Sequence, residues 1–132
     1  METQQHEMTI RVRYSETDAM GFLHHANYLD YFEVGRTELY RDRGGDYREL
    51  EANGLFFVVV NLSCQYKIPA RYDDVLLLKT RVARLTPAKL EHDYELWRDK
   101  DLLATAHTTL ACLNRDGVVQ RIPEAVTSRV EL

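Results

Sequence analysis

The chain lacks both a long hydrophobic run and an excess of positive charge. No stretch approaches the roughly 18 consecutive apolar residues of a membrane-spanning helix, and residues 1–7 are polar, unlike a secretion signal. The 17 lysines and arginines are outnumbered by 21 aspartates and glutamates, which is unfavourable for binding a phosphate backbone. We therefore expect a cytoplasmic protein with no membrane span and no nucleic-acid partner.

Cysteine is scarce as well. The two cysteines, Cys64 and Cys112, lie far apart in apolar, alternating segments, which matches neither a disulfide framework nor the spacing of metal ligands. Neither has the positively charged, partly open surroundings that activate a thiolate. We expect two buried free thiols.

What the chain does contain is the balance of a globular protein. Hydrophobic residues make up 45% and charged residues 29% of 132 residues, which is typical of one domain with a modest core. No linker, repeat or low-complexity tract interrupts the chain, so residues 1–132 are expected to form a single domain.

One amphipathic helix is expected over residues 25–43. Tyr28, Phe32, Gly35 and Leu39 recur at spacings of three and four, and the charged residues between them occupy the other sides of the helix, where a structural role is expected for Arg36. Candidate end signals are a cap at Asn27 and a stop at Gly44 and Gly45. Because glycine lowers helix propensity by about 1 kcal/mol, Gly35 on the apolar stripe suggests that another backbone approaches there.

The other apolar segments read as strands. They are bounded by turn residues, and the expected strands cover residues 9–13, 55–66, 75–84, 89–97 and 102–114. Residues 46–53 are expected to be a polar connection, residues 99–101 a tight hairpin turn, and the tail after Gly117 is left open. One helix covers only part of such a sheet, so the class is α+β and a second copy is expected to cover the rest.

A short loop ahead of the helix has the composition of an active site. It contains the carboxylate of Asp18, the turn residue Gly21 and the imidazoles of His24 and His25. A helix start presents unpaired N–H groups and the positive end of the helix dipole, which stabilise a developing negative charge. Asp18 would then act on a polarised carbonyl as nucleophile or general base, a choice that the sequence leaves open.

These residues resemble the 4-hydroxybenzoyl-CoA thioesterase family of hotdog-fold enzymes, particularly its YbgC-like acyl-CoA thioesterases. The likeness covers most of the chain and rests on residues at matching spacing: Tyr14, Thr17, Asp18, Gly21, His25, Asn27, Tyr28, Glu33, Arg36, Tyr66, Pro69, Ala70, Arg71 and Asp73.

The resemblance implies a five-stranded antiparallel sheet wrapped around one long central helix, with active sites at the interface of a homodimer or homotetramer. It implies hydrolysis of an acyl-CoA to a free acid and CoA, so coenzyme A is part of the substrate and no separate cofactor is expected. Asp18 matches the family's catalytic carboxylate, Gly21 the glycine at the turn, and the N–H near His25 the group that polarises the carbonyl. His24 replaces a more usual aromatic residue and Met20 a small one, which leaves the acyl preference open.

The remaining site residues have competing structural interpretations. Asp18 and His25 are the predicted catalytic residues, and the predicted substrate-binding residues are Tyr14, Gly21, His24, Asn27, Glu33, Phe57, Lys67, Arg71 and Lys89. The alternatives are a turn or helix cap for Asp18, core packing for Phe57, an ion pair with Arg36 for Glu33, and solvated charge for the cations. Tyr14 is expected either to pack in the core or to brace Asp18. No metal is expected, since adjacent histidines diverge at a helix start and no third ligand accompanies them. His92 and His107 are expected to be structural.

Two further hypotheses remain. An acyl carrier protein presents the same phosphopantetheine arm, so a carrier-protein thioester is an alternative substrate. A noncatalytic acyl-thioester binding module is the other, and Asp18 is the residue that argues against it. A hydratase of the same fold would pair a histidine with an acid in a differently placed motif, which this chain lacks.

Overall fold

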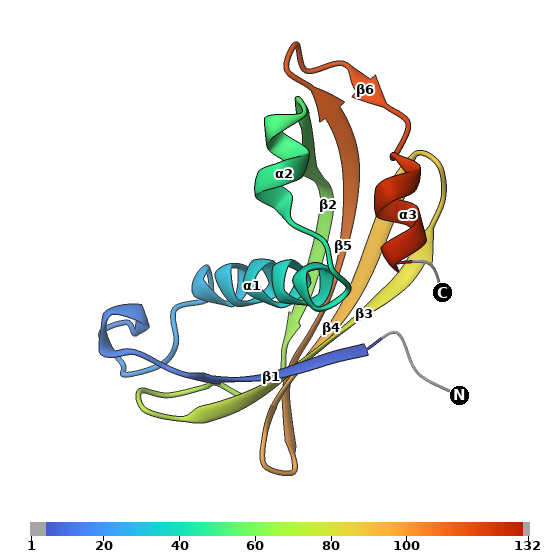
Figure 1. Cartoon of the computed structure of the whole chain (residues 1–132). Coiled ribbons are helices and arrows are strands. Elements are labelled where there is room, and N and C mark those ends of the chain that lie inside the picture. The colour runs from blue at the N-terminus through green and yellow to red at the C-terminus, as the bar shows by residue number, and fades with distance from the viewer. Residues whose placement is uncertain (1–4, 131–132) are drawn as a thin grey trace.

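The computed structural model describes residues 5–130 (Figure 1). Its strands are β1 (Gln5–Arg11), β2 (Leu55–Tyr66), β3 (Val75–Leu85), β4 (Lys89–Arg98), β5 (Asp101–Asn114) and β6 (Val119–Gln120). Its helices are α1 (Asn27–Asp42), α2 (Tyr47–Ala52) and α3 (Glu124–Val130), preceded by a short 3₁₀ turn at Tyr14–Glu16. The single-domain prediction covers residues 1–132, of which residues 1–4 and 131–132 lie outside the described part.

The strands form one antiparallel sheet in the order β1-β3-β4-β5-β2, with the short β6 added beside β5. The sheet is strongly twisted and curves around α1 (Figure 1). Helices α2 and α3 lie toward the end of the sheet that is opposite the loop before α1. The predicted α+β arrangement of one long helix in a wrapped sheet is confirmed, and β2 is left at a sheet edge.

The close contact between α1 and the sheet occurs at Gly35. A Cβ atom there would lie 2.5 Å from Oγ1 of Thr80 and 2.7 Å from Cδ2 of Leu78, both on β3. The predicted close approach is therefore present, although side chains rather than a backbone make it. Glycine is needed because any larger residue would push α1 away from the sheet.

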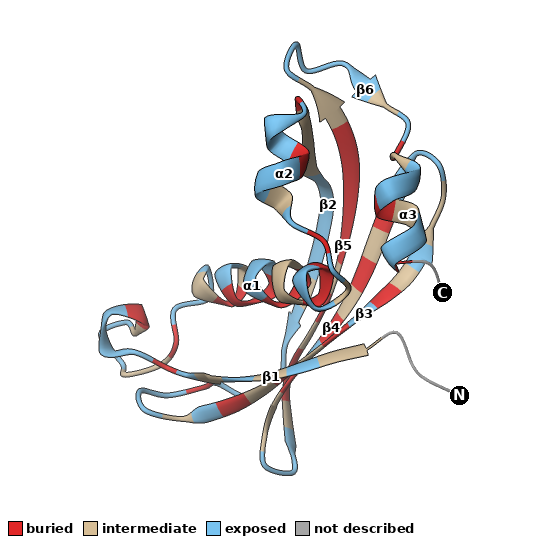
Figure 2. Cartoon of the chain, in the orientation of Figure 1, coloured by how far each residue is buried: buried red, intermediate tan, exposed pale blue. Residues whose placement is uncertain are grey.

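The core has two hydrophobic clusters, and the buried residues run along the inner side of the sheet (Figure 2). One cluster lies under the first half of α1 and includes Leu23, Tyr28, Phe32 and Ala70. The other lies under α2, α3 and the end of α1, with members such as Leu39, Leu50, Val126 and Val130.

Arg36 is buried, although its place outside the apolar stripe does not predict this. Its residue exposure is 9%, and its guanidinium donates to the hydroxyl of Tyr94 at 3.5 Å. The expected ion pair with Glu33 is present, with an N···O distance of 3.6 Å. A long side chain can reach a buried hydroxyl from the border of the apolar stripe, which helical spacing alone does not reveal.

Residues 46–53 form a helix rather than the expected polar connection. The side chain of Asp46 accepts a hydrogen bond from the N–H of Arg48 at 2.8 Å and so caps α2. Leu50 of this helix is buried in the core, and Tyr47 packs against the same cluster. Helix α2 is too short to show a full helical period, so its stability comes from this packing.

Most strand bounds agree with the predictions to within a residue, but β1 does not. It covers Gln5–Arg11 because this polar segment pairs in register with β3, from Gln5 opposite Arg81 to Arg11 opposite Val75. The hairpin turn is confirmed, with Asp99 at a positive φ of 52° between β4 and β5. The undecided tail forms β6 and α3.

Both cysteines are free. Cys112 is buried as expected, whereas Cys64 is only half-buried, and burial raises the pKa of each thiol. Within residues 5–130, no helix is both long enough and apolar enough to cross a membrane. The cytoplasmic location stays a prediction.

The two strand histidines differ in their surroundings, and neither lies in the loop before α1. His92 is almost completely buried, and this burial lowers its pKa to about 3, so its ring is neutral. His107 lies on the outer face of the sheet between two carboxylates, with Nδ1 2.6 Å from Asp93 and Nε2 2.8 Å from Glu91. The hydrogen bond with Asp93 is the main cause that raises the pKa of His107 above its ordinary value.

The raised pKa of His107 predicts a pH-dependent stability. Its protonated ring stabilises the fold fully below the unfolded-state pKa of about 6.5, and this contribution is lost as the pH rises through the higher folded-state pKa. In urea titrations above about pH 7, the free energy of unfolding should therefore fall more steeply for the wild type than for His107→Gln. His6→Gln is the matched control, because Nδ1 of His6 has no hydrogen-bond partner among the described residues. Parallel curves for wild type and His107→Gln would contradict the prediction.

Candidate active site

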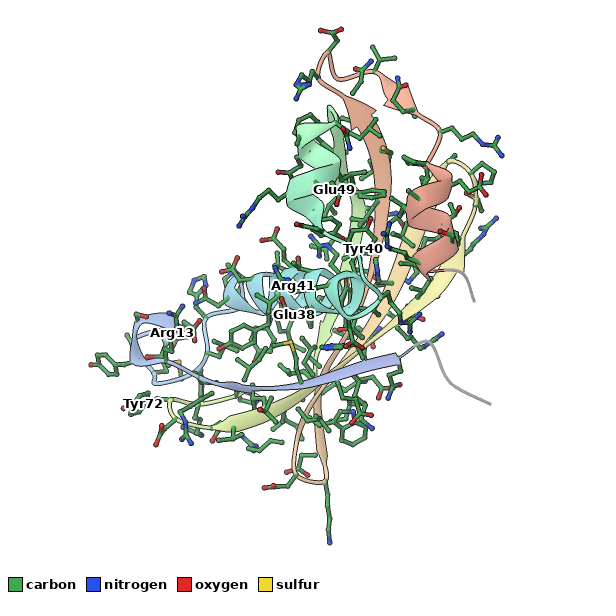
Figure 3. The ribbon with its side chains drawn as sticks, viewed as in Figure 1. Arg13, Glu38, Tyr40, Arg41, Glu49 and Tyr72 are labelled. Atoms are coloured by element: carbon green, nitrogen blue, oxygen red, sulfur yellow. The ribbon has the colours of Figure 1, made fainter. Side chains whose placement is uncertain are left out.

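The loop before α1 is held by pairing with a distant segment. Phe22 forms an antiparallel bridge with Arg71, and the N–H of Leu23 donates to the carbonyl of Ala70 at 2.8 Å. The loop and the segment between β2 and β3 accordingly lie at the same end of the molecule (Figure 1). Figure 3 shows Arg13 and Tyr72 at this end, whereas Glu49 lies on α2. Two parts of the motif that are about 50 residues apart thus meet at the helix start.

Asp18 is exposed, and only one of its two carboxylate oxygens accepts hydrogen bonds from the described residues. Its Oδ1 accepts hydrogen bonds from the N–H groups of Met20 at 2.9 Å and Phe22 at 3.2 Å. Its own N–H donates to the carbonyl of Phe22 at 2.8 Å. Oδ2 has no hydrogen-bond partner among residues 5–130, so one oxygen orients the carboxylate and the other is available.

Gly21 closes the turn that carries Asp18. Its N–H donates to the carbonyl of Asp18 at 3.0 Å, and its φ of +80° lies in the left-handed region. A Cβ atom at Gly21 would meet nothing within 4 Å. Backbone conformation, rather than space, therefore requires glycine here.

The start of α1 presents a free backbone donor at His25. The N–H of His24 donates to the carbonyl of Glu16 at 2.9 Å, and the N–H of Ala26 donates to Nδ1 of His24 at 3.1 Å. Between them, the N–H of His25 donates to no group in the described part of the chain. It lies at the positive end of the dipole of α1, which suits an oxygen that gains negative charge.

Asn27 does not cap the helix as predicted. Ala26 occupies the capping position without a side-chain hydrogen bond, and α1 begins at Asn27 itself. The amide of Asn27 donates instead to the carbonyl of Glu16 at 2.8 Å. The side chain therefore fixes the preceding loop against the helix.

The two adjacent histidines do not diverge. The rings of His24 and His25 stack with their centroids 4.3 Å apart. His24 uses Nδ1 as an acceptor within the loop, which leaves little freedom to orient both rings around one ion. Among residues 5–130, no group of three or more histidine, cysteine, aspartate or glutamate side chains is arranged to hold a metal.

Tyr66 is a site residue that the sequence did not single out beyond its place in the motif. It ends β2, and its hydroxyl donates to the carbonyl of His25 at 2.9 Å. Its ring packs edge-on against Tyr28, with centroids 4.9 Å apart, and burial is the main cause that raises its pKa to about 12. Tyr66 thus fixes the peptide whose neighbouring N–H faces the site, a role visible only once β2 and α1 are placed together.

Exposed aromatic and cationic side chains surround this loop. The guanidinium of Arg71 lies 4.6 Å from the ring centroid of Phe22, and Tyr14 contacts Tyr72 edge-on at 5.6 Å. Tyr14 is 77% exposed and has no contact with Asp18, so it is neither a core residue nor a brace for the carboxylate. Lys67 is exposed just after β2, close in sequence to Tyr66.

Three predicted site residues lie elsewhere in the single chain. Glu33 and Phe57 line one cavity of about 250 Å³, between α1, α2 and the sheet, together with Arg36, Thr37, Tyr47, Leu50, Glu51 and Leu110. Lys89 begins β4 and lines another hollow with Arg84, on the outer face of the sheet. Neither group includes a residue of the Asp18 loop.

Comparison with known proteins now gives the family. A family model described as "Thioesterase superfamily" matches residues 20–105. The chain is 36% identical to the acyl-CoA thioesterase YbgC of Haemophilus influenzae over 80% of this chain and 78% of that protein. It superimposes on the crystal structure of a DHNA-CoA thioesterase from Staphylococcus aureus with a TM-score of 0.86, at 30% identity, over 89% of this chain and 80% of that one.

A more distant relative is an acyl-acyl carrier protein thioesterase of Arabidopsis thaliana. The identity is 24%, over 94% of this chain and 66% of the plant protein. On the family match and the relatives above 30% identity, the chain belongs to the thioesterase superfamily, and the resemblance seen in its sequence is confirmed.

Two of the left-handed glycines, Gly21 and Gly117, provide a matched test of the loop. Both have a φ near +80°, and a Cβ at either would meet nothing within 4 Å. Alanine should therefore cost each a similar stability, about 1 kcal/mol, measured by chemical denaturation. Only Gly21→Ala distorts the turn that carries Asp18, so it should also lower thioester turnover by about 10-fold or more. Equal turnover in Gly21→Ala and Gly117→Ala would contradict this role for the loop.

Proposed function

We propose that this protein is an acyl-CoA thioesterase whose reaction takes place at the loop between the 3₁₀ turn and α1. The observation that carries the proposal is the pairing, on one short loop, of an available Asp18 oxygen with an unpaired N–H of His25. A thioester hydrolase needs a nucleophile or base and a donor for the carbonyl oxygen. The family and the named relatives support the same class of reaction.

The carbonyl oxygen of the thioester is proposed to accept a hydrogen bond from the N–H of His25. The positive end of α1 stabilises the negative charge that this oxygen acquires as the carbonyl carbon becomes tetrahedral. Because Tyr66 holds the carbonyl of His25 and the loop hydrogen bonds hold the residues on either side, little reorganisation is needed during the reaction.

Asp18 has two routes to the same products. As a nucleophile, Oδ2 attacks the carbonyl carbon, the C–S bond breaks, CoA leaves as a thiolate, and water then hydrolyses the mixed anhydride. As a general base, Asp18 takes a proton from a water molecule whose oxygen attacks the carbonyl carbon, and the C–S bond then breaks to release the CoA thiolate. Either route consumes one water and yields a free acid and CoA. The imidazole of His25 is the proposed proton donor to the thiolate, and no metal or separate cofactor takes part.

A second copy of the chain is proposed to complete the site. β2 is an edge strand of twelve residues, with exposed apolar side chains at Val59, Val60, Leu62 and Tyr66. Such an edge is a ready template for pairing with another chain. Pairing across β2 would also bring a partner to the side of the molecule that holds the Glu33 and Phe57 cavity, where an acyl group can be bound. A homodimer is the minimum assembly, and a homotetramer extends it.

The acyl carrier of the substrate is proposed to be CoA. Arg71 and Lys67 lie beside the loop and are the proposed contacts for CoA phosphates, with Lys89 available from the outer face of the sheet. A carrier-protein thioester is the second candidate, because the Arabidopsis relative is named for that substrate. The two substrates share the phosphopantetheine arm, and a direct comparison of their hydrolysis separates them.

The first test is free-thiol release from short, long and aromatic acyl-CoA esters with wild type and Asp18→Ala. Removal of the nucleophile or base should lower kcat by at least about 10²-fold while the fold is retained. Asp46→Ala is the matched control, since Asp46 also accepts a hydrogen bond from an N–H two residues later but lies at α2.

The outcomes of this test separate the hypotheses. Wild-type turnover in Asp18→Ala would disprove the proposed mechanism. Release from a carrier-protein thioester but from no CoA ester would favour the second candidate. Tight binding of CoA esters without release of thiol from either substrate would indicate a binding module.

The proposed assembly has its own test. Leu62→Asp places a charge on the exposed edge strand, where it would be buried in a pairing across β2. Light scattering coupled to size-exclusion chromatography should show a shift toward the monomer, together with a loss of turnover. The equivalent change on an exposed loop, Val118→Asp, should leave the mass unchanged. A wild-type monomer that is fully active would contradict the shared site.

A further inference from the structure

Glu16 is a buried carboxylate two residues before Asp18, and the proposed chemistry does not use it. Its residue exposure is 9%, and its Oε1 accepts hydrogen bonds from the hydroxyl of Tyr31 at 2.7 Å and from the N–H of Arg13 at 2.8 Å. Its Oε2 lies 3.1 Å from the guanidinium of Arg13. A carboxylate with three donors at such distances is firmly held.

The carbonyl of the same residue holds the start of α1. It accepts hydrogen bonds from the N–H of His24 at 2.9 Å and from the amide of Asn27 at 2.8 Å. Glu16 therefore connects the segment after β1, through Arg13, with Tyr31 on α1. Its carbonyl also connects the loop with the start of that helix. Asp18 and His25 lie between these attachments in the chain.

The electrostatics show that this carboxylate is ionised and its partner neutral. Burial alone would raise the pKa of Glu16, but the hydrogen bonds from the N–H of Arg13, from Tyr31 and from the Arg13 guanidinium together hold it below its ordinary value. Burial, and then the hydrogen bond to Glu16, raise the pKa of Tyr31. At neutral pH the hydroxyl of Tyr31 is thus a donor to an anionic carboxylate.

We propose that Glu16 and Tyr31 are positioning residues that set the placement of the Asp18 carboxylate relative to the His25 N–H. Neither residue touches the substrate in this arrangement. The proposal rests on the function proposed above, because it assigns these residues to the geometry of that reaction. A shift of about 1 Å between a nucleophile and its acceptor can lower a rate by about 10²-fold, so loosening the attachment should act on kcat rather than on substrate binding.

The test compares two tyrosine substitutions that each remove a short buried hydrogen bond. Tyr31→Phe removes the 2.7 Å bond to Glu16. Tyr94→Phe removes the 2.6 Å bond between Tyr94 and Thr108, among the sheet strands, and with it the longer 3.5 Å bond from Arg36. Both should lower thermal stability to a similar extent. Only Tyr31→Phe should lower kcat, by about 10-fold or more, with KM changed by less than about 3-fold.

Glu16 provides the conservative rescue. Glu16→Ala removes every side-chain attachment and should lower kcat by about 10²-fold. Glu16→Gln keeps an oxygen that can accept from Tyr31 and from the N–H of Arg13, and the exposed Arg13 side chain can move away from the new amide. Glu16→Gln should therefore retain most of the turnover that Glu16→Ala loses.

Hydrogen–deuterium exchange gives a readout that does not depend on turnover. Peptides that cover residues 17–25 should exchange faster in Tyr31→Phe and Glu16→Ala than in wild type or Tyr94→Phe. Unchanged exchange in these peptides, or an equal effect of Tyr31→Phe and Tyr94→Phe on kcat, would overturn the inference. If Asp18→Ala abolishes turnover while Tyr31→Phe preserves it, only the positioning role fails. If Asp18→Ala preserves turnover, the proposed role of Asp18 fails, and the exchange data alone decide whether Glu16 holds the loop.

Discussion

The structure depends on how deeply α1 sits in the sheet. At Gly35 the helix backbone approaches the side chains of Thr80 and Leu78 too closely for any Cβ atom. The same helix begins beside the segment between β2 and β3, where Phe22 forms a bridge with Arg71. A shift of the helix away from β3 would separate the loop from the strand end that holds it.

The candidate site is assembled mainly from backbone groups. N–H groups of the loop orient Asp18, an unpaired N–H of His25 faces outward, and the carbonyls of Glu16 and His25 accept bonds that hold the loop and helix together. Fixed backbone dipoles need no rearrangement when charge develops nearby, which is the property that electrostatic catalysis requires. Side chains such as Tyr66 and Tyr31 contribute by fixing these backbone groups.

Much of this arrangement could be predicted from the sequence, because strong periodicity and turn chemistry act locally. The extent of α1, the four long strands and the position of Asp18 next to a helix start all follow from such patterns. The features that these patterns did not predict have a different origin. Arg36 is buried because its guanidinium reaches Tyr94, and Asn27 binds a carbonyl eleven residues earlier instead of capping its own helix.

The residues that the sequence did not identify all depend on partners that are distant in the sequence. Helix α2 is short, and its stability comes from burying Leu50 and Tyr47 against strands that lie elsewhere in the sequence. Tyr66 and Tyr31 act on the loop through hydroxyl groups that meet it only in the folded chain. No local pattern distinguishes them from ordinary core tyrosines, since their partners are set by topology.

Leu23 gives the loop a property that its exposed position conceals. Although Asp18 and Met20 face solvent, Leu23 is only 4% exposed and belongs to the core cluster that also contains Val12 and Ala70. Swinging the loop outward would draw Leu23 from that cluster and expose apolar surface to water, at a cost of a few kcal/mol, about 1.5 to 3. Because the loop is anchored in the core through Leu23, it does not open and close over the site. The binding surface for a thioester is therefore preformed.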